Sequence, residues 1–265
     1  MTGVISRTNC RRVVLSAVLM MGVGIATGCS SGGRSQSAQG TTAPSRSVAE
    51  TTTIDDSPTT ALPAGAVPGL DDYDGDGKLD TTCGTQDFGA ALVLRIPCMI
   101  TTASEPAAGT TLVKGSLFRL PSSTDIDLQG ISGSLLFARD ASGAKVVIFV
   151  FNSDALFETG SANIGSTDTL NGIIHVINDR FPGGAIQVRG HTDSTGSAAA
   201  NQSLSERRAA TTRDYLTGHN LSAAEITSVG LGSTVPLTEE KKPDGSDSPE
   251  GRAFNRRVEV VVRTT

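Results

Sequence analysis

The sequence predicts an α/β (α+β) sandwich in which helices cover one mixed sheet, and three patterns indicate it. Residues 146–151 form a continuous apolar run, which is typical of a strand covered on both faces. Residues 186–189 alternate between apolar and polar side chains, and valines alternate in the same way over residues 258–262, which predicts two further strands. Segments with helical periodicity separate these strands. The expected order over residues 146–265 is therefore β-α-β-α-β-β.

The elements between these strands are predicted from their own patterns. One stripe of a first helix carries Leu170, Ile173, Ile174 and Ile177. This helix should end before Pro182. Ser222 and Glu225 have the spacing of a capping box ahead of a strand that begins near Ile226. Pro249 should open a helical turn that runs through Asn255.

The second long helix should place an arginine on the face that packs against the core. Four of its residues share one stripe: Leu204, Arg208, Thr211 and Tyr215. Arg207 lies about 100° further round the helix and can be solvated. Arg208 is therefore expected to point towards the loop that precedes the helix, and that loop contains Asp193.

A buried arginine needs an anion, and two interpretations follow. In the first, Arg208 forms an internal ion pair with a nearby carboxylate such as Asp193 and has only a structural role. In the second, the two side chains line a pocket that offers one fixed cation and one fixed anion. Such a pocket suits a ligand that carries both an ammonium and a carboxylate, as the head group of an amino acid does.

Four motifs, in order, resemble the OmpA-like C-terminal domain family. They are Ala155-Leu-Phe-Glu-Thr-Gly-Ser-Ala162, Gly190-His-Thr-Asp-Ser-Thr-Gly196, Asn201 with Leu204-Ser-x-x-Arg208-Ala209, and Gly251-Arg-Ala-Phe-Asn-Arg-Arg-Val258. The resemblance implies a domain that is not an enzyme. It implies instead that the domain binds peptidoglycan non-covalently through the meso-diaminopimelate residue of the stem peptide.

The resemblance also assigns roles to residues of this chain. Asp193 falls on the position that takes the ligand ammonium, and Arg208 on the position that takes the carboxylate. The other ligand-binding residues implied are Asn201, Thr192, Leu204, Glu158 and Thr159, followed by Asn255 and Arg256. Glu158 stands where the family usually has Asp, and the family uses mainly the backbone there. For Asn255-Arg256-Arg257 the alternative is that the arginines brace loops through ion pairs.

Residues 1–28 have the composition of an export signal, with three arginines, no acid, and an apolar run too short for a permanent membrane helix. The signal ends Ala26-Thr-Gly-Cys29, which resembles a bacterial lipoprotein signal and implies a lipid on Cys29. Ala26 replaces the commoner Leu, and a plain cleaved signal is the alternative. Residues 29–69 are rich in Ser, Thr, Gly, Ala and Pro and predict a disordered tether.

Residues 70–145 are expected to contain an Asp-rich turn and a small β-rich segment of unknown role. The possible calcium ligands of the turn are Asp72, Asp74, Asp76, Lys78 through its carbonyl, and Asp80. Cys83 occupies the twelfth position of this loop, so calcium binding and a solvated acidic turn are equally weighted. After loss of Cys10 and lipidation of Cys29, the exported chain retains Cys83 and Cys98, which predicts a disulfide. Short strands near residues 91–94, 112–113, 117–118 and 135–137 either form a subdomain or extend the main sheet.

Loss of the three arginines in residues 1–28 changes the net charge from -5 to -8, which argues against nucleic acid as a partner. No arrangement of nucleophile, base or metal ligands predicts an enzyme, and calcium is the one cofactor considered. The predicted function is to tether a lipid-anchored protein of the cell envelope, on the exported side of a membrane, to the cell wall. The alternative is a wall-docking subunit of a secretion, motor or division complex whose partner binds residues 84–145.

Overall fold

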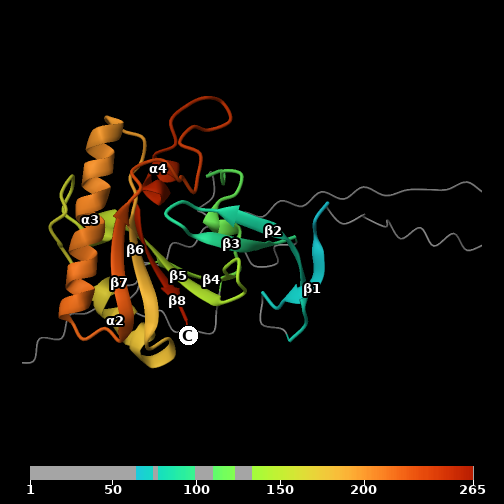
Figure 1. The fold of residues 1–265 in the computed structure, drawn as a ribbon. Helices are drawn as coiled ribbons and strands as arrows, with labels where there is room; N and C mark the ends of the chain where they lie inside the picture. The colour runs from blue at the N-terminus through green and yellow to red at the C-terminus, as the bar shows by residue number, and fades with distance from the viewer. Residues whose placement is uncertain (1–63, 74–76, 99–109, 123–132, 265) are drawn as a thin grey trace, which may run out of the picture. The chain divides into compact units, whose positions relative to one another are not determined.

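The computed structural model describes residues 64–73, 77–98, 110–122 and 133–264, which contain two sheets (Figure 1). The first sheet is antiparallel and comprises β1 (Val67–Asp71), β2 (Asp80–Asp87) and β3 (Val93–Pro97). The second comprises β4 (Gly133–Arg139), β5 (Lys145–Asn152), β6 (Gly184–Gly190), β7 (Ala223–Gly230) and β8 (Arg257–Arg263). The helices are η1 (Leu117–Arg119), α1 (Ser153–Leu156), α2 (Asp168–Arg180), α3 (Ala198–Gly218) and α4 (Pro249–Asn255).

The larger sheet has the strand order β4-β5-β8-β6-β7. Strands β6 and β7 are parallel, and the other neighbouring pairs are antiparallel, so the predicted mixed sheet and α/β class are confirmed. Because β5 and β6 are both antiparallel to β8, strands β5, β6 and β7 all end at the same edge of the sheet. The segments that follow β5 and β6 therefore meet at that edge, where β8 begins.

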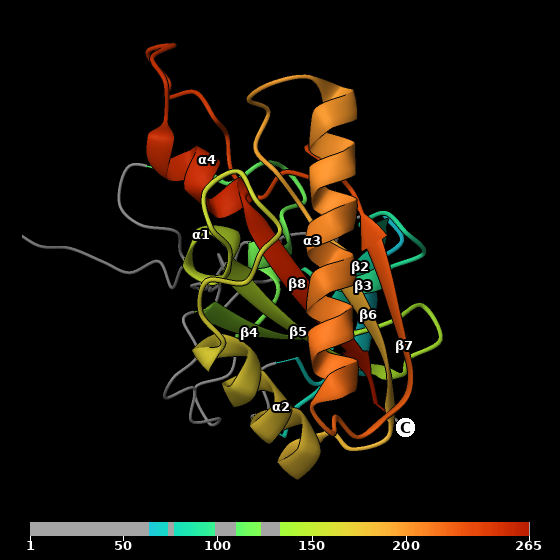
Figure 2. The ribbon, with the colours of Figure 1, turned by 90° about the vertical axis from the view of Figure 1, so that its left-hand side faces the viewer.

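Both faces of this sheet are covered, and helices α2 and α3 cover one of them (Figure 2). Strand β5 contributes side chains to the cores on both faces. Its side chains at 147, 149 and 151 belong to the core on the helix side, together with residues of α2 such as Leu170. Those at 146, 148 and 150 belong to a second core, together with Phe88, Leu92 and Leu94. The continuous apolar run thus forms a strand buried on both faces, as predicted.

The second core lies beneath the turn between β2 and β3, and polar side chains of the sheet reach that turn. The Gln187 amide donates to the carbonyl of Ala90 (3.3 Å), and the Arg263 guanidinium donates to the carbonyl of Ala91 (3.3 Å). The Arg189 guanidinium donates to the carbonyl of Phe88. We refer to residues 84–97, which contain this turn, as the cover segment. It is a layer of the same fold because it shares a core with the sheet.

The predicted segment 70–145 therefore divides into two parts. Strand β4 pairs with β5 along its whole length, so the large sheet begins at Gly133 rather than at residue 146. Strands β1 to β3 form their own sheet. Strand β1 begins at Val67, inside the range predicted as a tether, and the remainder of that range up to residue 63 lies outside the described residues.

Three local predictions differ from the structure. The run at 112–113 contributes one isolated bridge, between Leu112 and Thr238, and the run at 117–118 forms η1 instead of a strand. The strand predicted to begin near Ile226 begins at Ala223, so the capping-box pattern lies largely within β7. The backbone N–H of Ser222 instead donates to the Asn178 side chain at the end of α2 (2.7 Å).

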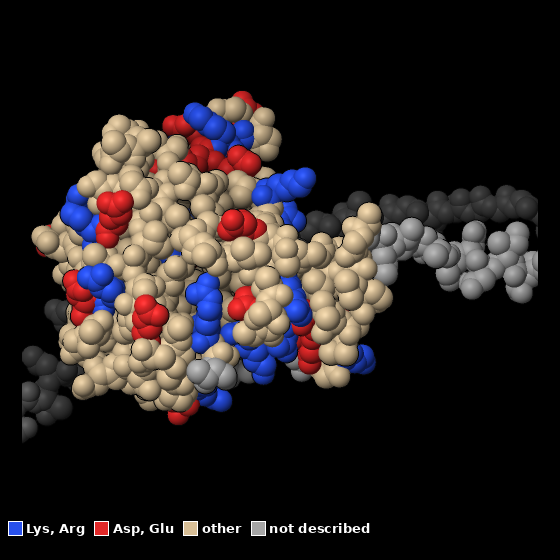
Figure 3. All heavy atoms as spheres, in the orientation of Figure 1, with Lys and Arg blue, Asp and Glu red and all other residues tan. Residues whose placement is uncertain are grey.

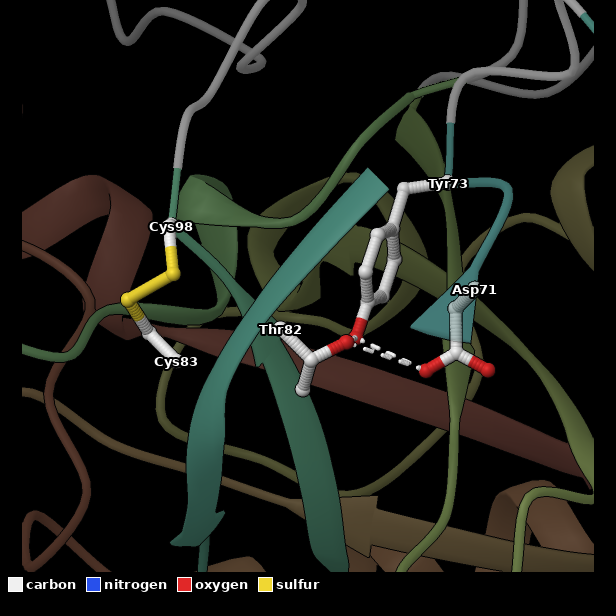
Figure 4. The surroundings of a disulfide bond; sticks show 5 residues. All are labelled: Asp71, Tyr73, Thr82, Cys83 and Cys98. Carbon is white, nitrogen blue, oxygen red and sulfur yellow. Dashed lines mark hydrogen bonds between the residues drawn. A yellow bond between two sulfur atoms is a disulfide. The ribbon is translucent and has the colours of Figure 1, made fainter. Parts of the chain in front are cut away.

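The small sheet is held by a disulfide and by a buried carboxylate. The disulfide joins Cys83 of β2 to Cys98, directly after β3 (Figure 4). Asp71 accepts hydrogen bonds from the Tyr73 hydroxyl (3.1 Å) and from Thr82 (3.2 Å). Burial raises the pKa of Tyr73 to about 12. Asp71 also forms ion pairs with Arg95 of β3 and Arg139 of β4, at 3.1 and 3.2 Å, and so links the two sheets.

The predicted export signal, residues 1–28, and the predicted lipidation site, Cys29, lie outside the described residues. Of the helices in the described ranges, none combines the length and the apolar character that a membrane span requires. On the face shown in Figure 3, acidic and basic side chains are interspersed.

Candidate functional site

The residues predicted to bind ligand gather at the sheet edge where β5, β6 and β7 end and β8 begins. Each comes from a segment attached to that edge. The segments are α1 with the turn after it, the loop after β6, helix α3, and the start of β8 after α4. The fold therefore brings together motifs that lie up to about one hundred positions apart in the sequence, a separation at which no local pattern constrains side-chain contacts.

Two glycines allow α3 to pack closely against this edge. A Cβ atom at Gly190 would lie 2.2 Å from the carbonyl oxygen of Ser205, and one at Gly230 would lie 2.3 Å from the backbone nitrogen of Glu206. Both contacts are with backbone and leave no room for a side chain. The Gly of the Gly-His-Thr-Asp motif is thus required for the approach of α3, which brings Arg208 to the site.

Asp193 lies in the loop after β6 and is 8% exposed. Its Oδ1 accepts a hydrogen bond from the backbone N–H of Thr195 (2.9 Å), and its Oδ2 accepts one from Arg256 (2.8 Å). Asn201 of α3 donates to the carbonyls of Asp193 and Thr195, both at 3.1 Å. On the other side, the N–H of Thr192 donates to the carbonyl of Gly232 (2.9 Å). The loop is therefore fixed from both directions.

Arg208 is buried on α3, and Arg207 is exposed, as predicted. The Nε of Arg208 donates to the carbonyl of Ser161 (2.8 Å), and its Nη1 donates to the hydroxyl of Ser153 (2.9 Å). The guanidinium also lies over the ring of Phe157, 5.2 Å from its centroid. Burial lowers the pKa of Arg208, an effect opposed by the charge of Asp154. Arg208 thus ties α1 and the turn after it to α3.

The buried row of α3 differs from the predicted stripe. It consists of Asn201, Ser205, Arg208, Ala209, Thr212 and Leu216. Leu204, Thr211 and Tyr215 lie beside it and are half-buried. The shift arises because small and polar residues form the closest contact with the sheet, as the glycines at 190 and 230 require.

Arg256 joins two carboxylates at the site. Its Nη1 binds Asp193 (2.8 Å), and its Nη2 and Nε bind Asp154 of α1 (2.7 and 2.9 Å). The hydrogen bond with Asp154, followed by that with Asp193, raises the pKa of Arg256. Within the described residues no ion pair joins Asp193 to Arg208, so the pair named in the first interpretation is not formed. The hydrogen bonds of Arg208 with Ser153 and Ser161 nevertheless agree with a structural role. The bracing alternative fits Arg256, although Asp154 was not predicted.

Asn255 is fully buried and has a bracing role as well. Its Oδ1 accepts from the backbone N–H groups of Leu237 (2.8 Å) and Thr238 (3.1 Å). Its Nδ2 donates to the carbonyl of Thr238 (3.0 Å) and to Glu240 (2.8 Å). These contacts hold residues 237–240, and the ligand contact of Asn255 stays a prediction. Sequence reasoning did not identify Glu240, which lies in a polar loop without a motif.

Glu158 and Thr159 are exposed in the turn after α1. Backbone hydrogen bonds close this turn, from Glu158 to the carbonyl of Asn163 (3.1 Å) and from Ser161 to the carbonyl of Glu158 (3.0 Å). Thr192 is buried, and its hydroxyl has no hydrogen-bond partner among the residues that the structure describes. The backbone N–H and carbonyl of Glu158 are thus used within the turn, and the ligand contact implied for Glu158 stays a prediction.

A second charged cluster lies directly behind the site and is fully buried. Arg257 binds Glu259 (2.6 Å), and Glu259 also lies 3.2 Å from Arg189 and 3.3 Å from His191. Burial, with a contribution from the charge of Arg257, lowers the pKa of His191 to about 4. Burial alone would raise the pKa of Glu259, but its neighbours His191, Arg257 and Arg189 hold it well below its ordinary value. His191 is therefore neutral near pH 7.

The possible calcium loop cannot be assembled from the described residues, because Asp74 and Asp76 lie outside them. The carboxylates of Asp72 and Asp80 accept backbone hydrogen bonds from Gly77 (3.1 Å) and Tyr73 (2.9 Å). Elsewhere in the described ranges, no three His, Cys, Asp or Glu side chains are grouped so as to hold a metal ion.

Comparison with known proteins identifies part of this chain. Residues 156–249 match the OmpA family. The peptidoglycan-binding protein ArfA of Mycobacterium tuberculosis is 42% identical over 81 residues, which cover 31% of this chain and 23% of ArfA. The "Probable lipoprotein YiaD" of Escherichia coli is 32% identical over 123 residues, 46% of this chain and 52% of YiaD. A crystal structure of a MotB-like protein from Desulfovibrio vulgaris, at 28% identity and a TM-score of 0.40, covers 52% of this chain and 82% of that one.

Similarity extends to a protein of another name. The photosystem I P700 chlorophyll a apoprotein A2 of Gloeobacter violaceus is 36% identical over 128 residues, which cover 48% of this chain and 14% of that protein. The chain thus spans about half the length of YiaD and much less of ArfA and the photosystem protein.

Proposed function

Because residues 156–249 form an OmpA-like domain, we propose that this protein binds peptidoglycan non-covalently, without turnover, through the meso-diaminopimelate of the stem peptide. The observation that carries the proposal is the placement of Asp193 and Arg208 at one sheet edge, on separate segments that are each held by the surrounding structure. Similarity to a peptidoglycan-binding protein supports it.

Both side chains retain hydrogen-bonding capacity for a ligand. A carboxylate offers roughly four lone-pair sites, and described residues donate to Asp193 at two of them. The Arg208 guanidinium has more N–H donors than its two hydrogen bonds with described residues use. An ammonium on Asp193 and a carboxylate on Arg208 are therefore the contacts that the proposal requires.

The charges of the site also favour a zwitterionic ligand. Asp154 and Asp193 balance Arg208 and Arg256. An amino-acid head group brings one positive and one negative charge, so its binding leaves no uncompensated charge in a poorly solvated place. A purely cationic or purely anionic ligand would leave such a charge.

We further propose that a lipid on Cys29 anchors the chain to a membrane on its exported side, with the following segment as a tether. The similarity to a protein named as a lipoprotein supports this part. Residues 30–63 would reach roughly 110 Å when fully extended. This reach suits a domain that must find the cell wall some distance from its membrane.

The alternative role, a subunit that docks a larger envelope complex to the wall, keeps the same ligand site. Its predicted partner surface, residues 84–145, includes the cover segment, whose Phe88, Leu92 and Leu94 are buried against the sheet. In the described part of the chain, the exposed large apolar side chains belong to Val67, Leu70 and Leu79. A protein partner would therefore find apolar contacts on β1 and the turn after it, outside the predicted range.

The test uses the chain without residues 1–28 and with Cys29→Ser, so that it stays in solution. Titration with meso-diaminopimelate should move amide resonances at residues 158–163 and 192–201, and lysine should not. Asp193→Asn and Arg208→Lys should each abolish this response, whereas the matched control Arg207→Gln, one residue away and exposed, should not. A folded Asp193→Asn, Arg208→Lys double variant that still sediments with cell-wall sacculi would overturn the proposal.

A further inference from the structure

Glu240 contacts two segments of the candidate site. Its Oε1 accepts from the backbone N–H of Ser194 (3.0 Å), and its Oε2 accepts from the Ser194 hydroxyl (2.5 Å). Oε1 also accepts from the Nδ2 of Asn255 (2.8 Å). Ser194 directly follows Asp193, and Asn255 directly precedes Arg256. One carboxylate thus touches the neighbours of both residues in the ion pair between Asp193 and Arg256.

The backbone around Asp193 depends on these contacts. Before Asp193, the loop is held by the hydrogen bond from Thr192 to Gly232, and α3 holds it through Asn201. After Asp193, the backbone N–H of Ser194 is satisfied by Glu240. Without Glu240, this N–H would lose its acceptor, and the loop after Asp193 would be held only by the hydrogen bonds at Thr195, which are those from Thr195 to Asp193 and from Asn201 to Thr195.

Glu240 is itself held in place. It lies at the base of a hairpin in which Ser248 donates to its carbonyl (3.0 Å) and Lys241 bridges to Asp247. Ser248 also caps α4 by accepting from Gly251 (3.1 Å). A Cβ atom at Gly251 would lie 2.1 Å from the carbonyl oxygen of Glu239, so α4 packs directly on this strand-like segment. The position of the carboxylate is therefore fixed by the hairpin and by α4.

We propose that Glu240 is a positioning residue for ligand binding, whose carboxylate holds Ser194 and Asn255 and thereby fixes the orientation of Asp193 and Arg256. The inference rests on the proposed function, because the ligand is the one proposed for Asp193. A ligand site that is held in its bound geometry loses less conformational freedom on binding, so loosening it weakens affinity without removing a ligand contact.

The contacts favour a carboxylate. Three groups face Glu240: the N–H and the O–H of Ser194 and the amide of Asn255. A glutamine could accept from both N–H groups with its oxygen and donate its NH₂ to the Ser194 hydroxyl, but these hydrogen bonds would be neutral. Hydrogen bonds to a charged group are stronger, so Glu240→Gln keeps the size of the side chain and weakens its hold on both segments. Glu239, the neighbouring residue, is exposed, so Glu239→Gln is the matched control.

The experiment measures three quantities on the chain without residues 1–28 and with Cys29→Ser. They are the Kd for meso-diaminopimelate, the hydrogen exchange rate of the Ser194 amide without ligand, and the midpoint of urea unfolding. Glu240→Gln should raise the Kd about tenfold and speed exchange at Ser194 more than in the strands. Ser194→Ala, which loses the hydroxyl contact alone, should raise the Kd about threefold, in line with a weaker neutral hydrogen bond.

Three outcomes separate the two proposals. Unchanged affinity in Glu240→Gln, with binding intact in the parent chain, would overturn the positioning role and leave the proposed function standing. A weaker affinity accompanied by equally faster exchange throughout the domain would also overturn it, because the effect would be one of global stability. Absence of binding in the parent chain would overturn the proposed function and the ligand role of Glu240 together.

Discussion

Arg256 and Arg257 are consecutive residues with opposite surroundings. Arg256 is 30% exposed and joins Asp154 and Asp193 at the rim of the sheet edge. Arg257 is 1% exposed and joins Glu259 in the buried cluster behind it. Arg256 caps the C-terminus of α4, and Arg257 is the first residue of β8.

The difference separates charges that hold the fold from charges that can bind a ligand. In the buried cluster, Glu259 is the one carboxylate among the described residues that forms ion pairs with Arg189 and Arg257, and removing it would leave buried charge without a partner. At the rim, Arg256 has two carboxylate partners and a side chain that is 30% exposed. The following predictions test this contrast, from the largest expected effect to the smallest.

Glu259→Gln should lower the free energy of unfolding by about 3–5 kcal/mol, because it leaves Arg189 and Arg257 buried without an anion. Urea denaturation measures this loss. Glu239→Gln, an exposed control, should leave the midpoint unchanged. If Glu259→Gln unfolds at the midpoint of the parent chain, the buried cluster does not stabilise the fold, and the contrast between the two arginines fails.

The free energy of unfolding should fall as the pH is lowered from 6.5 towards 4, the range in which His191 is neutral in the folded chain and protonated in the unfolded chain. The pKa of His191 is about 4 in the folded chain, and the ordinary pKa of a histidine is 6.5, so between these limits the unfolded chain binds more protons. The stabilisation is complete above pH 6.5 and declines below it, by about 2 kcal/mol between pH 7.5 and pH 5. Urea unfolding at both values measures the decline.

The control for the pH effect is His191→Gln, which removes the titrating group from the cluster with Arg189, Arg257 and Glu259. This variant should lose less stability between pH 7.5 and pH 5 than the parent chain does. Equal losses in the two proteins would show that groups outside the buried cluster cause the decline.

Asp154→Asn should change stability by less than about 1 kcal/mol, because the Asp154 side chain is 45% exposed and surface ion pairs contribute little. Asp154→Asn should affect ligand affinity more clearly than stability. Arg256 would keep Asp193 as its one carboxylate partner. This ion pair would compete with the ligand ammonium for Asp193 and raise the Kd about threefold. Asp179→Asn, which breaks the exposed pair with Arg180 on α2, is the control. Equal affinities in the parent and Asp154→Asn would show that Arg256 does not compete with the ligand.

Much of the fold could be predicted from periodicity, and the failures have a common cause. Strands β5, β6 and β8 carry apolar residues at every second position or continuously, so their core faces were readable. Strand β2 escaped prediction because Asp80–Asp87 contains no large apolar residue, and its stability comes from the disulfide and from Thr82 in the Asp71 cluster. Strand β4 was recognised as a short run, but its pairing with β5 depends on a partner that no local pattern specifies.

The residues of the candidate site that lie in motifs could be predicted from the sequence. Their ion-pair and hydrogen-bond partners could not. Burial of Arg208 followed from its helix position, and its solvated neighbour Arg207 followed from the same geometry. The partner of Asp193 did not, because Arg256 lies far along the chain and two acids compete for it. Glu240 carried no signal at all, since its role depends on donors supplied by Ser194 and Asn255 across the fold.

The disulfide has a mechanical consequence for a chain that is pulled from its N-terminus. Force entering at β1 and reaching Cys83 passes through the sulfur atoms to Cys98, so residues 84–97 are shielded from tension. These residues form the cover segment, which shares a core with the sheet. If the membrane anchor and the wall contact proposed above load the chain in this way, β1 should separate before the covered sheet and the ligand site at its edge.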